Sequence, residues 1–212
     1  MAVEKLSTGV RQEQIAQAVL GLIATRGAKG LSVAAVARRV GLAPSALYRH
    51  FENKDQMLNA AIDLFQAQVL THLEEVEGES PHCLERLHRL LVRQVRMIRE
   101  NQVVAMPRIV FSDNLYGRNP QKRFQVYKIL ESFIEKLSDM ILEGKKRGEI
   151  HAGIEPTSAA RVFLAIFQSS GIFWFLSDGE FDVTRYAEKA WRIFKRSVEA
   201  SSSPWKVNRY SH

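Results

Sequence analysis

The stretch from Ser32 to Lys54 reads SVAAVARRVGLAPSALYRHFENK, and it predicts two short helices joined by a sharp turn. The first helix has an apolar stripe at the i, i+3, i+4, i+7 spacing of one helix face. The stripe consists of Val33, Val36, Ala37 and Val40. Gly41 supplies the turn, because glycine adopts a left-handed backbone conformation at little cost. Pro44 then begins the second helix, at a position where the backbone N–H would be unpaired in any residue.

The second helix is expected to bury Leu47 and Phe51, which lie four residues apart. At 100° per residue, this arrangement turns the opposite side of the helix outward. The outward side carries small, aromatic and basic groups, namely Ser45, Ala46, Tyr48 and Arg49, with His50 on the flank. Such a helix-turn-helix fits the major groove of DNA, where it can read base edges while its flanks hold phosphates. A generic pair of amphipathic helices is the alternative interpretation.

The distribution of charge favours the nucleic-acid interpretation. Residues 1–54 contain eight Lys or Arg and three Asp or Glu, a net charge of +5. The other 158 residues contain 22 and 20, a net charge of +2, so most of the total of +7 lies in the quarter of the chain that contains the motif. A basic domain on a nearly neutral body is typical of a protein that binds nucleic acid.

The run GLAPSALYRHFENKDQML, residues 41–58, resembles the recognition-helix signature of TetR-family transcriptional regulators. The upstream helix around residues 15–27 and the entry at residues 31–33 are also similar to that family's DNA-binding domain, so the resemblance covers residues 8–68. Beyond residue 70 it lies only in architecture, a helical body of suitable length. One departure is Ala43, at a helix start where the family more often has Ser or Thr. Its methyl group cannot cap the helix, a loss of about 1 kcal/mol.

The resemblance implies a set of groove-facing residues, namely Pro44, Ser45, Ala46, Tyr48 and His50. It also implies that Ser32 contacts a phosphate at the entry of the first helix and that Lys54 neutralises a phosphate at the start of the following helix. In such proteins Tyr48 and His50 meet the DNA backbone more often than the bases. Arg49 points most directly away from the core, so it is a further candidate for a base or phosphate contact. The alternatives are a core position for Tyr48 and a solvated surface position for His50.

Helical patterns continue to the end of the chain. Asn53 is expected to cap a helix from Lys54 to Val76, with Gln56 three residues later closing a capping-box-like arrangement. An unbroken apolar stripe along this helix begins at Leu58 and crosses the boundary between two domains. No segment shows sustained strand alternation, which predicts an all-α protein. The expected parts are an N-terminal three-helix helix-turn-helix DNA-binding domain (8–68), a C-terminal helical ligand-binding and dimerisation domain (69–200) and a tail (201–212).

Aromatic residues concentrate in the C-terminal part, where nine of the eleven Phe and all three Trp lie beyond residue 100. They suggest a pocket for an apolar or aromatic small molecule among the middle helices. The candidate lining residues are Phe111, Tyr116, Phe124, Tyr127, Phe163, Phe167 and Trp174. For any one of these residues, ordinary core or dimer packing is the more frequent role.

The last two expected helices have features of a dimer interface. Small residues keep part of the first helix surface low, and the second helix has an apolar stripe. The candidate interface residues are Ala165, Ser169, Ala187, Ala190, Trp191 and Phe194. In TetR-like proteins this pair of helices meets its twin in a four-helix bundle, so the resemblance implies a twofold homodimer. Packing within the same subunit is the alternative.

These observations favour a ligand-responsive transcriptional regulator, with repression as the expectation from the family. It would bind a near-palindromic operator in double-stranded DNA as a homodimer and be released by a small apolar or aromatic effector. The alternative is a helical small-molecule-binding or scaffold protein without sequence-specific DNA binding. An enzyme is not expected, because the six histidines form no metal-binding pattern and no Gly-rich phosphate loop is present. No metal or cofactor is expected.

The sequence also bears on the compartment. The N-terminus MAVEKLS lacks the apolar region of a signal peptide, and the longest apolar run, residues 162–176, is interrupted by QSSG. The single cysteine, Cys83, cannot form an internal disulfide. We therefore expect a protein of the reducing cytoplasm, bacterial if the resemblance holds, with no membrane partner.

Overall fold

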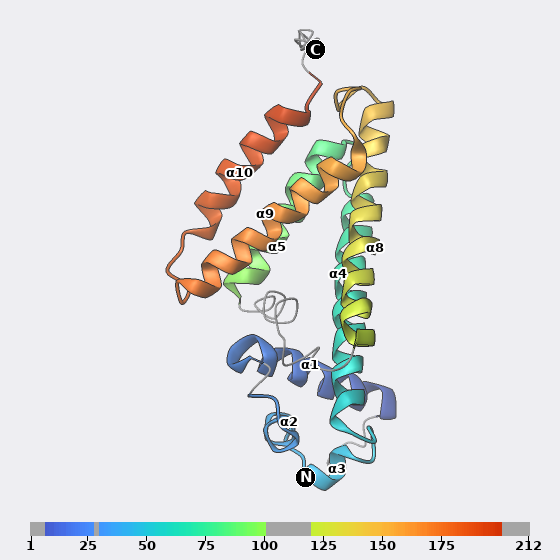
Figure 1. The fold of residues 1–212 in the computed structure, drawn as a ribbon, viewed down its shortest axis with the longest axis vertical. Coiled ribbons are helices and arrows are strands. Elements are labelled where there is room, and N and C mark those ends of the chain that lie inside the picture. The colour runs from blue at the N-terminus through green and yellow to red at the C-terminus, as the bar shows by residue number, and fades with distance from the viewer. Residues whose placement is uncertain (1–6, 28–29, 101–119, 201–212) are drawn as a thin grey trace.

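The computed structural model of the chain describes residues 7–27, 30–100 and 120–200. Its helices are α1 (Thr8–Arg26), α2 (Val33–Val40), α3 (Pro44–Leu47), α4 (Lys54–Glu77), α5 (Cys83–Arg99), α8 (Pro120–Lys146), α9 (Pro156–Leu176) and α10 (Val183–Val198). These three ranges contain no strand and one isolated antiparallel bridge, between Ile150 and Glu199. The all-α prediction is confirmed. Figure 1 shows an elongated molecule with α1, α2 and α3 at one end and α10 toward the other.

The N-terminal helices surround a hydrophobic core of their own, which we call the head core. Ile15 and Ile23 of α1, Val36 of α2 and Leu47 of α3 are each at most 1% exposed within it. The apolar stripe of α2 therefore packs inward, as its spacing predicts. α1 lies across the first half of α4, so the head is a compact cluster from which α4 projects (Figure 1).

α4 belongs to both ends of the molecule. Its N-terminal half gives Met57 and Ile62 to the head core, while Leu73 and Val76 enter a second core, the body core, formed with α5, α8, α9 and α10. The helix has 24 residues and is therefore about 36 Å long. Its bounds confirm the long helix predicted from Lys54 onward.

α8 lies beside α4 and also reaches the head (Figure 1). Lys122 Nζ lies 2.7 Å from Asp55 Oδ1, and Gln125 Nε2 donates a hydrogen bond of 2.6 Å to Asp63 Oδ1. Val126 and Ile129 of the same helix are buried in the head core. A helix that the sequence places in the C-terminal domain thus completes the core of the N-terminal one.

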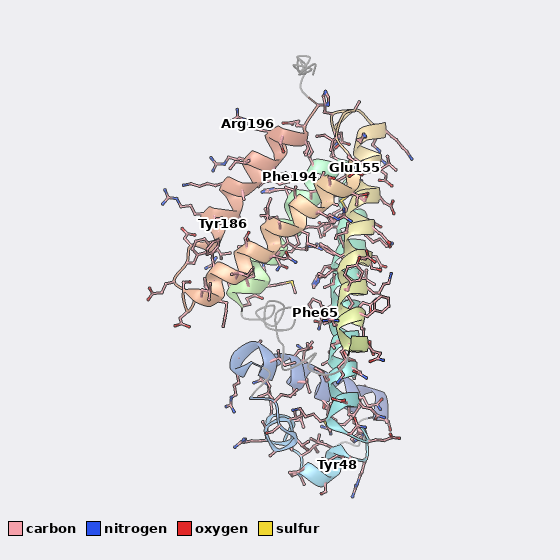
Figure 2. The ribbon with its side chains drawn as sticks, in the orientation of Figure 1. Tyr48, Phe65, Glu155, Tyr186, Phe194 and Arg196 are labelled. Atoms are coloured by element: carbon pink, nitrogen blue, oxygen red, sulfur yellow. The ribbon has the colours of Figure 1, made fainter. Side chains whose placement is uncertain are left out.

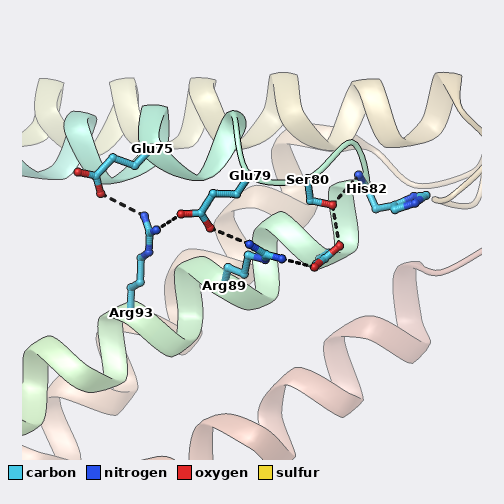
Figure 3. Close-up of polar contacts among 7 residues, drawn as sticks. Glu75, Glu79, Ser80, His82, Arg89 and Arg93 are labelled. Atoms are coloured by element: carbon cyan, nitrogen blue, oxygen red, sulfur yellow. Dashed lines mark hydrogen bonds and ion pairs between the residues drawn. The ribbon is translucent and has the colours of Figure 1, made fainter.

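A chain of ion pairs crosses the turn between α4 and α5 (Figure 3). Arg93 Nη1 lies 3.1 Å from Glu75 Oε2, and the same guanidinium also pairs with Glu79. Glu79 in turn pairs with Arg89 at 3.0 Å, and Arg89 pairs with Glu85. The alternating charges link the end of α4 to α5, two helices that carry the body core.

These contacts perturb the acidity of the two central carboxyl groups. A hydrogen bond from Arg89 holds the pKa of Glu79 below its ordinary value. Hydrogen bonds from Ser80 and then Arg89 lower the pKa of Glu85 in the same way. Both groups therefore remain ionised, and the network persists, as the pH falls toward the ordinary range of glutamate titration.

The start of α9 is fixed by a charged cap. The Glu155 carboxylate accepts hydrogen bonds from the backbone N–H groups of Thr157 at 2.9 Å and Ser158 at 2.6 Å. Hydrogen bonding to Ser158 and Thr157 lowers the pKa of Glu155 to about 2. An anion at a helix N-terminus satisfies free amides and complements the helix dipole, so this cap stabilises α9.

Candidate nucleic-acid interface

α2 begins and ends at the residues that the sequence indicates. Ser32 caps its N-terminus, with Oγ accepting a hydrogen bond of 3.1 Å from the Ala35 N–H. The Ser32 side chain is exposed and its hydroxyl hydrogen remains available as a donor. Gly41 ends the helix with φ of +69°, a left-handed conformation that favours glycine. The helix therefore presents a hydroxyl and free amides at its entry.

The second helix of the motif is shorter than the spacing of its apolar residues suggests. α3 spans Pro44–Leu47, and the chain continues from Tyr48 to His50 as tighter turns. The backbone N–H groups of Arg49 and His50 bond to carbonyls three residues earlier, at 3.3 and 2.9 Å, in the manner of a 3₁₀ helix. Ala43 precedes the helix without a side-chain cap, as its methyl group requires.

Two buried side chains anchor this segment and turn its other side to solvent. Leu47 is fully buried and Phe51 is 7% exposed, whereas Tyr48 is 53% exposed. Figure 2 shows Tyr48 at the extreme end of the head. This exposure rules out the alternative interpretation of Tyr48 as a core residue. Arg49 is also exposed. Of the other candidates, Pro44 and Ser45 are exposed, while Ala46 and His50 are half-buried.

A contact from α1, which the sequence gives no signal for, holds the end of this segment. Gln12 Nε2 donates a hydrogen bond of 3.0 Å to the His50 backbone oxygen, across 38 residues of sequence. The Nδ1 atom of His50 is buried and has no hydrogen-bond partner within the described ranges. Because Nδ1 is buried, Nε2 is the ring nitrogen left to contact another molecule.

The N-terminus of α4 forms a second polar entry beside the motif. Asn53 Oδ1 accepts a hydrogen bond of 2.9 Å from the Gln56 N–H, and Gln56 Oε1 accepts one of 2.9 Å from the Glu52 N–H. This reciprocal arrangement resembles the predicted capping box. It differs in that the Gln56 side chain accepts from the N–H of Glu52 rather than from that of Asn53. Lys54 is the first residue of the helix and is exposed. A positive side chain here adds to the positive end of the helix dipole.

Two exposed cations of α2, Arg38 and Arg39, are absent from the candidates that the sequence supplied. They follow each other in the last turn of the helix, and two adjacent arginines outside its apolar stripe are the signal that identifies them. Arg39 lies across α1, because a Cβ atom on Gly21 would sit only 2.7 Å from its Nη2. Gly21 therefore makes room for the guanidinium between the two helices.

Comparison with known proteins identifies the family. The family model described as "Bacterial regulatory proteins, tetR family" matches residues 15–61, and that described as "YsiA-like protein, C-terminal region" matches residues 64–197. The chain belongs to the tetR family of bacterial regulatory proteins. The resemblance seen in the motif thus extends through the body, and the protein is a transcriptional regulator rather than an enzyme.

Relatives of this TetR-family protein cover nearly its whole length. The nucleoid occlusion factor SlmA of Vibrio vulnificus is 24% identical over 190 residues, which cover 89% of this chain and 96% of that protein. SlmA of Marinobacter nauticus is 28% identical over 192 residues, 89% of this chain and 95% of the relative. These relatives span both the DNA-binding head and the body.

Solved structures show the same fold. FadR from Bacillus subtilis in complex with stearoyl-CoA superposes with a TM-score of 0.70 at 21% identity, covering 85% of this chain and 96% of FadR. A TetR transcriptional regulator from Chloroflexus aurantiacus has a TM-score of 0.77 at 18% identity, with 92% and 98% covered. In this family, repression and a homodimer are typical.

The apolar stripe predicted to form the dimer interface lies inside the subunit instead. Ala187, Trp191 and Phe194 of α10 are 3 to 7% exposed. The ring of Trp191 stacks on His88 of α5 at 5.1 Å, and Phe194 lies 5.3 Å from Phe163 of α9. These residues are therefore corrected to core positions, because α5 and α9 cover this side of α10.

A different apolar surface is exposed, and we call it the α9–α10 outer face. It comprises Val162, Ala165, Ser169, Phe173 and Leu176 of α9 with Tyr186, Ala190 and Ile193 of α10. Leu176 is 70% and Ile193 is 73% exposed. The Tyr186 hydroxyl lies 2.8 Å from Ser169 Oγ, which joins the two stripes into one surface. The predicted Ala165, Ser169 and Ala190 lie on this face.

The same exposure accounts for the apolar character of α9. Among the helices that the structure describes, α9 alone is long and apolar enough, by length and composition, to cross a membrane. Its most apolar window has a mean hydropathy of 1.5. Only 28% of that window is buried within the subunit. Contiguous exposed apolar surface of this kind marks an interaction site.

Five of the seven candidate pocket residues are described, and the structure does not bring these five together. Phe163 and Phe167 contact each other in the body core as tilted rings, with 5.0 Å between ring centres, and Trp174 is half-buried between the two cores. Phe124 and Tyr127 are 60% and 52% exposed on α8, so they are corrected to surface positions. They are exposed because they lie on the side of α8 opposite the buried Val126 and Ile129. Two other candidates, Phe111 and Tyr116, lie outside the described residues.

Within the described residues, a cavity of about 650 Å³ lies against the head. Its walls come from α1, the end of α2 and the end of α5. The lining residues are Gln14, Gln17, Ala18, Leu20, Gly21, Ala24, Thr25, Arg39, Val40 and Glu100. Its size is in the range of small-molecule sites.

Proposed function

We propose that this TetR-family protein is a ligand-responsive transcriptional repressor of the bacterial cytoplasm. As a homodimer it binds a near-palindromic operator, and a small apolar or aromatic effector releases it. The observation that carries the proposal is the contrast within one short segment. Leu47 and Phe51 are buried while Tyr48 and Arg49 are exposed, so the segment is rigidly anchored and presents aromatic and basic groups outward.

In this proposal the exposed segment enters the major groove. Ser45 and Arg49 reach base edges, and Tyr48 and His50 hold the DNA backbone. Ser32 and Lys54 contact phosphates on the two flanks, because each lies at a helix N-terminus with free amides. A twofold dimer places its two heads one DNA turn apart, about 34–36 Å, which requires an operator of matching symmetry.

We propose that this dimer forms through the α9–α10 outer face. Several of its large apolar side chains are about half exposed or more in the single subunit. A twofold axis would pair the face with its own copy and remove this surface from water, as in the four-helix bundle typical of the family.

Two helices supply the route by which an effector acts on the head. α4 contributes to both cores, and the Lys122–Asp55 ion pair ties α8 to the residue next to Lys54. A shift of either helix would move the phosphate-contacting end of α4. Because a ligand acts only through its different affinity for two states, a shift from 1:99 to 99:1 requires about 5.5 kcal/mol. The stearoyl-CoA bound to FadR supports an effector site in this fold.

Selection from randomised duplexes followed by fluorescence anisotropy at two salt concentrations tests the proposal. The protein should enrich a near-palindromic sequence and bind it with a steep salt dependence. Arg49→Ala should weaken binding, whereas Lys136→Ala, an exposed lysine of α8, should not. Without any enriched sequence, the helical small-molecule-binding or scaffold protein becomes the better description.

Base reading is tested separately from phosphate binding. Ser45→Ala should change the order of preferred operators in the same selection, because it alters a group at the base edges. An unchanged order would remove Ser45 from base readout. The proposed coupling between effector and heads is tested by comparing the separation of the two heads in the DNA-bound and effector-bound forms. The same separation in both forms would contradict it.

A further inference from the structure

α10 carries a row of exposed cations that the proposed function leaves unused. We call it the α10 basic stripe, and it consists of Arg185, Lys189, Arg192 and Arg196. All four side chains are exposed, and none takes part in a salt bridge or ring contact in the part of the chain that the structure describes. The spacing of four, three and four residues places them on one face over about 16 Å of helix.

The stripe faces away from the rest of the subunit. At 100° per residue its centre lies about 170° from the centre of the buried side that holds Ala187, Trp191 and Phe194. It lies about 100° from the apolar stripe of Tyr186, Ala190 and Ile193. A dimer formed through the α9–α10 outer face would therefore leave the basic stripe open to solvent.

Nearby acidic groups do not neutralise the stripe. Within the helix, Glu188 lies three residues after Arg185 and four before Arg192, but its carboxylate pairs with His88 of α5 at 3.3 Å. Beyond its end, Glu199 pairs with Lys195 at 3.4 Å. Asp182 lies before the first turn, where its side chain accepts a hydrogen bond of 3.0 Å from the Arg185 N–H. From Lys189 onward the stripe is a line of cations without a carboxylate on its own face.

The chemistry of the stripe indicates what it binds. Guanidinium groups, three of the four cations, bind phosphate oxygens with two parallel hydrogen bonds. No aromatic side chain lies between these arginines, whereas the anchors of protein interfaces combine Arg with Trp and Tyr. A nucleic-acid backbone needs only cations, because neutralising phosphates releases counterions. A phosphate backbone is thus favoured over an acidic protein.

The position of the stripe decides which DNA it can contact. Figure 2 shows Arg196 at one end of the long axis and Tyr48 at the other. A straight duplex held by the heads therefore does not reach the stripe. We propose that the α10 basic stripe binds the phosphate backbone of a second duplex, without sequence preference, so that one dimer joins two duplexes. The joining rests on the proposed operator binding by the heads, whereas phosphate binding by the stripe does not.

A two-step surface-binding experiment tests this proposal. The duplex enriched by the protein is immobilised and saturated with full-length protein, and a second duplex of unrelated sequence is then passed over it. We expect a second mass increase at about 50 mM salt. Four phosphate contacts predict a salt slope of about −3.6, so the affinity of this second step should fall about 100-fold by about 200 mM salt.

Charge reversal at the stripe should separate the two steps. Arg192→Glu with Arg196→Glu should keep the first step and weaken the second by at least about tenfold, because two phosphate contacts become repulsions. Lys136→Glu with Lys146→Glu is the matched control. It makes the same change in net charge at exposed positions of α8 and should leave both steps intact. Both double variants should fold, since the substituted side chains are exposed.

Several outcomes would overturn the proposal. One is that the wild-type protein shows no second binding step at about 50 mM salt. Another is that the stripe variant binds the second duplex with the same affinity as the control variant. A third is that polyglutamate or phosphatidylserine vesicles displace the second duplex and bind more tightly than it does. Displacement by polyglutamate would assign the stripe to an acidic protein, and displacement by the vesicles would assign it to a membrane. A missing first step would instead contradict operator binding. In that case the protein is attached through its N-terminus, and the two double variants are compared for binding of the unrelated duplex.

Discussion

The two ends of the molecule place different chemistry next to their cores. In the head, fully buried Leu47 is followed by exposed Tyr48, an aromatic ring with a polar tip. In the body, the buried Phe194 is preceded by Ile193, an aliphatic side chain that is 73% exposed. An exposed ring with a hydroxyl beside Arg49 suits a hydrated anion, whereas an exposed aliphatic group needs another protein surface. The comparison supports the proposal that one end meets DNA and the other meets a second copy of the chain.

The largest expected effect tests the anchored side of the head. Leu47→Ala should lower the free energy of unfolding by about 3 to 5 kcal/mol, because it removes a fully buried side chain and leaves a cavity. Tyr48→Ala, one residue along, should change it by less than about 0.5 kcal/mol. Urea denaturation followed by circular dichroism measures both values. Equal losses from the two variants would end the distinction between anchor and exposed surface.

The next effect tests the exposed side of the body. Ile193→Glu should raise the dimer dissociation constant at least about 100-fold, because the interface would bury an unpaired charge. Leu142→Glu is the control, since Leu142 is an exposed apolar residue of α8 and is not part of the α9–α10 outer face. Sedimentation equilibrium measures the constant. An intact dimer in the Ile193→Glu variant would show that this face is not the interface.

A smaller effect tests the flank of the head. Lys54→Ala should weaken binding to all duplexes alike and make the salt dependence shallower by about one unit of slope, because one phosphate contact is lost. Anisotropy titrations over a series of salt concentrations measure the slope, with Lys136→Ala as the control. A change in sequence preference with an unchanged slope would contradict the phosphate role of Lys54.

The smallest effect concerns acid stability of the body. The pKa of Glu155 falls from 4.5 to about 2 on folding, so its ionised cap stabilises the native state above pH 4.5 and this contribution is lost as the pH falls toward 2. The thermal midpoint of Glu155→Gln should therefore lie below that of the wild type at neutral pH, and the gap should narrow in acid. Glu135→Gln, at an exposed position of α8, should show no such gap. A gap that is constant with pH would exclude the charged cap.

Much of the head could be predicted from the sequence because its signals are local. Ser32, Gly41, Pro44 and Asn53 act on backbone within a few residues of themselves, so each cap and turn follows from neighbouring residues. The exposure of Tyr48 follows from the fixed angle between it and Leu47. The bond from Gln12 to His50 had no such signal, because it joins residues 38 apart and depends on how α1 lies across the motif.

The body shows what periodicity leaves open. α10 has one apolar stripe through Ala187 and Trp191 and another through Tyr186 and Ile193, and both repeat at helical spacing. The sequence determined that this segment is an amphipathic helix and that the N-terminal quarter holds a basic helix-turn-helix. Tertiary structure alone decided which stripe is buried. The physical reason is that burial depends on the helices that cover a face, here α5 and α9, and a helix repeat does not specify its neighbours.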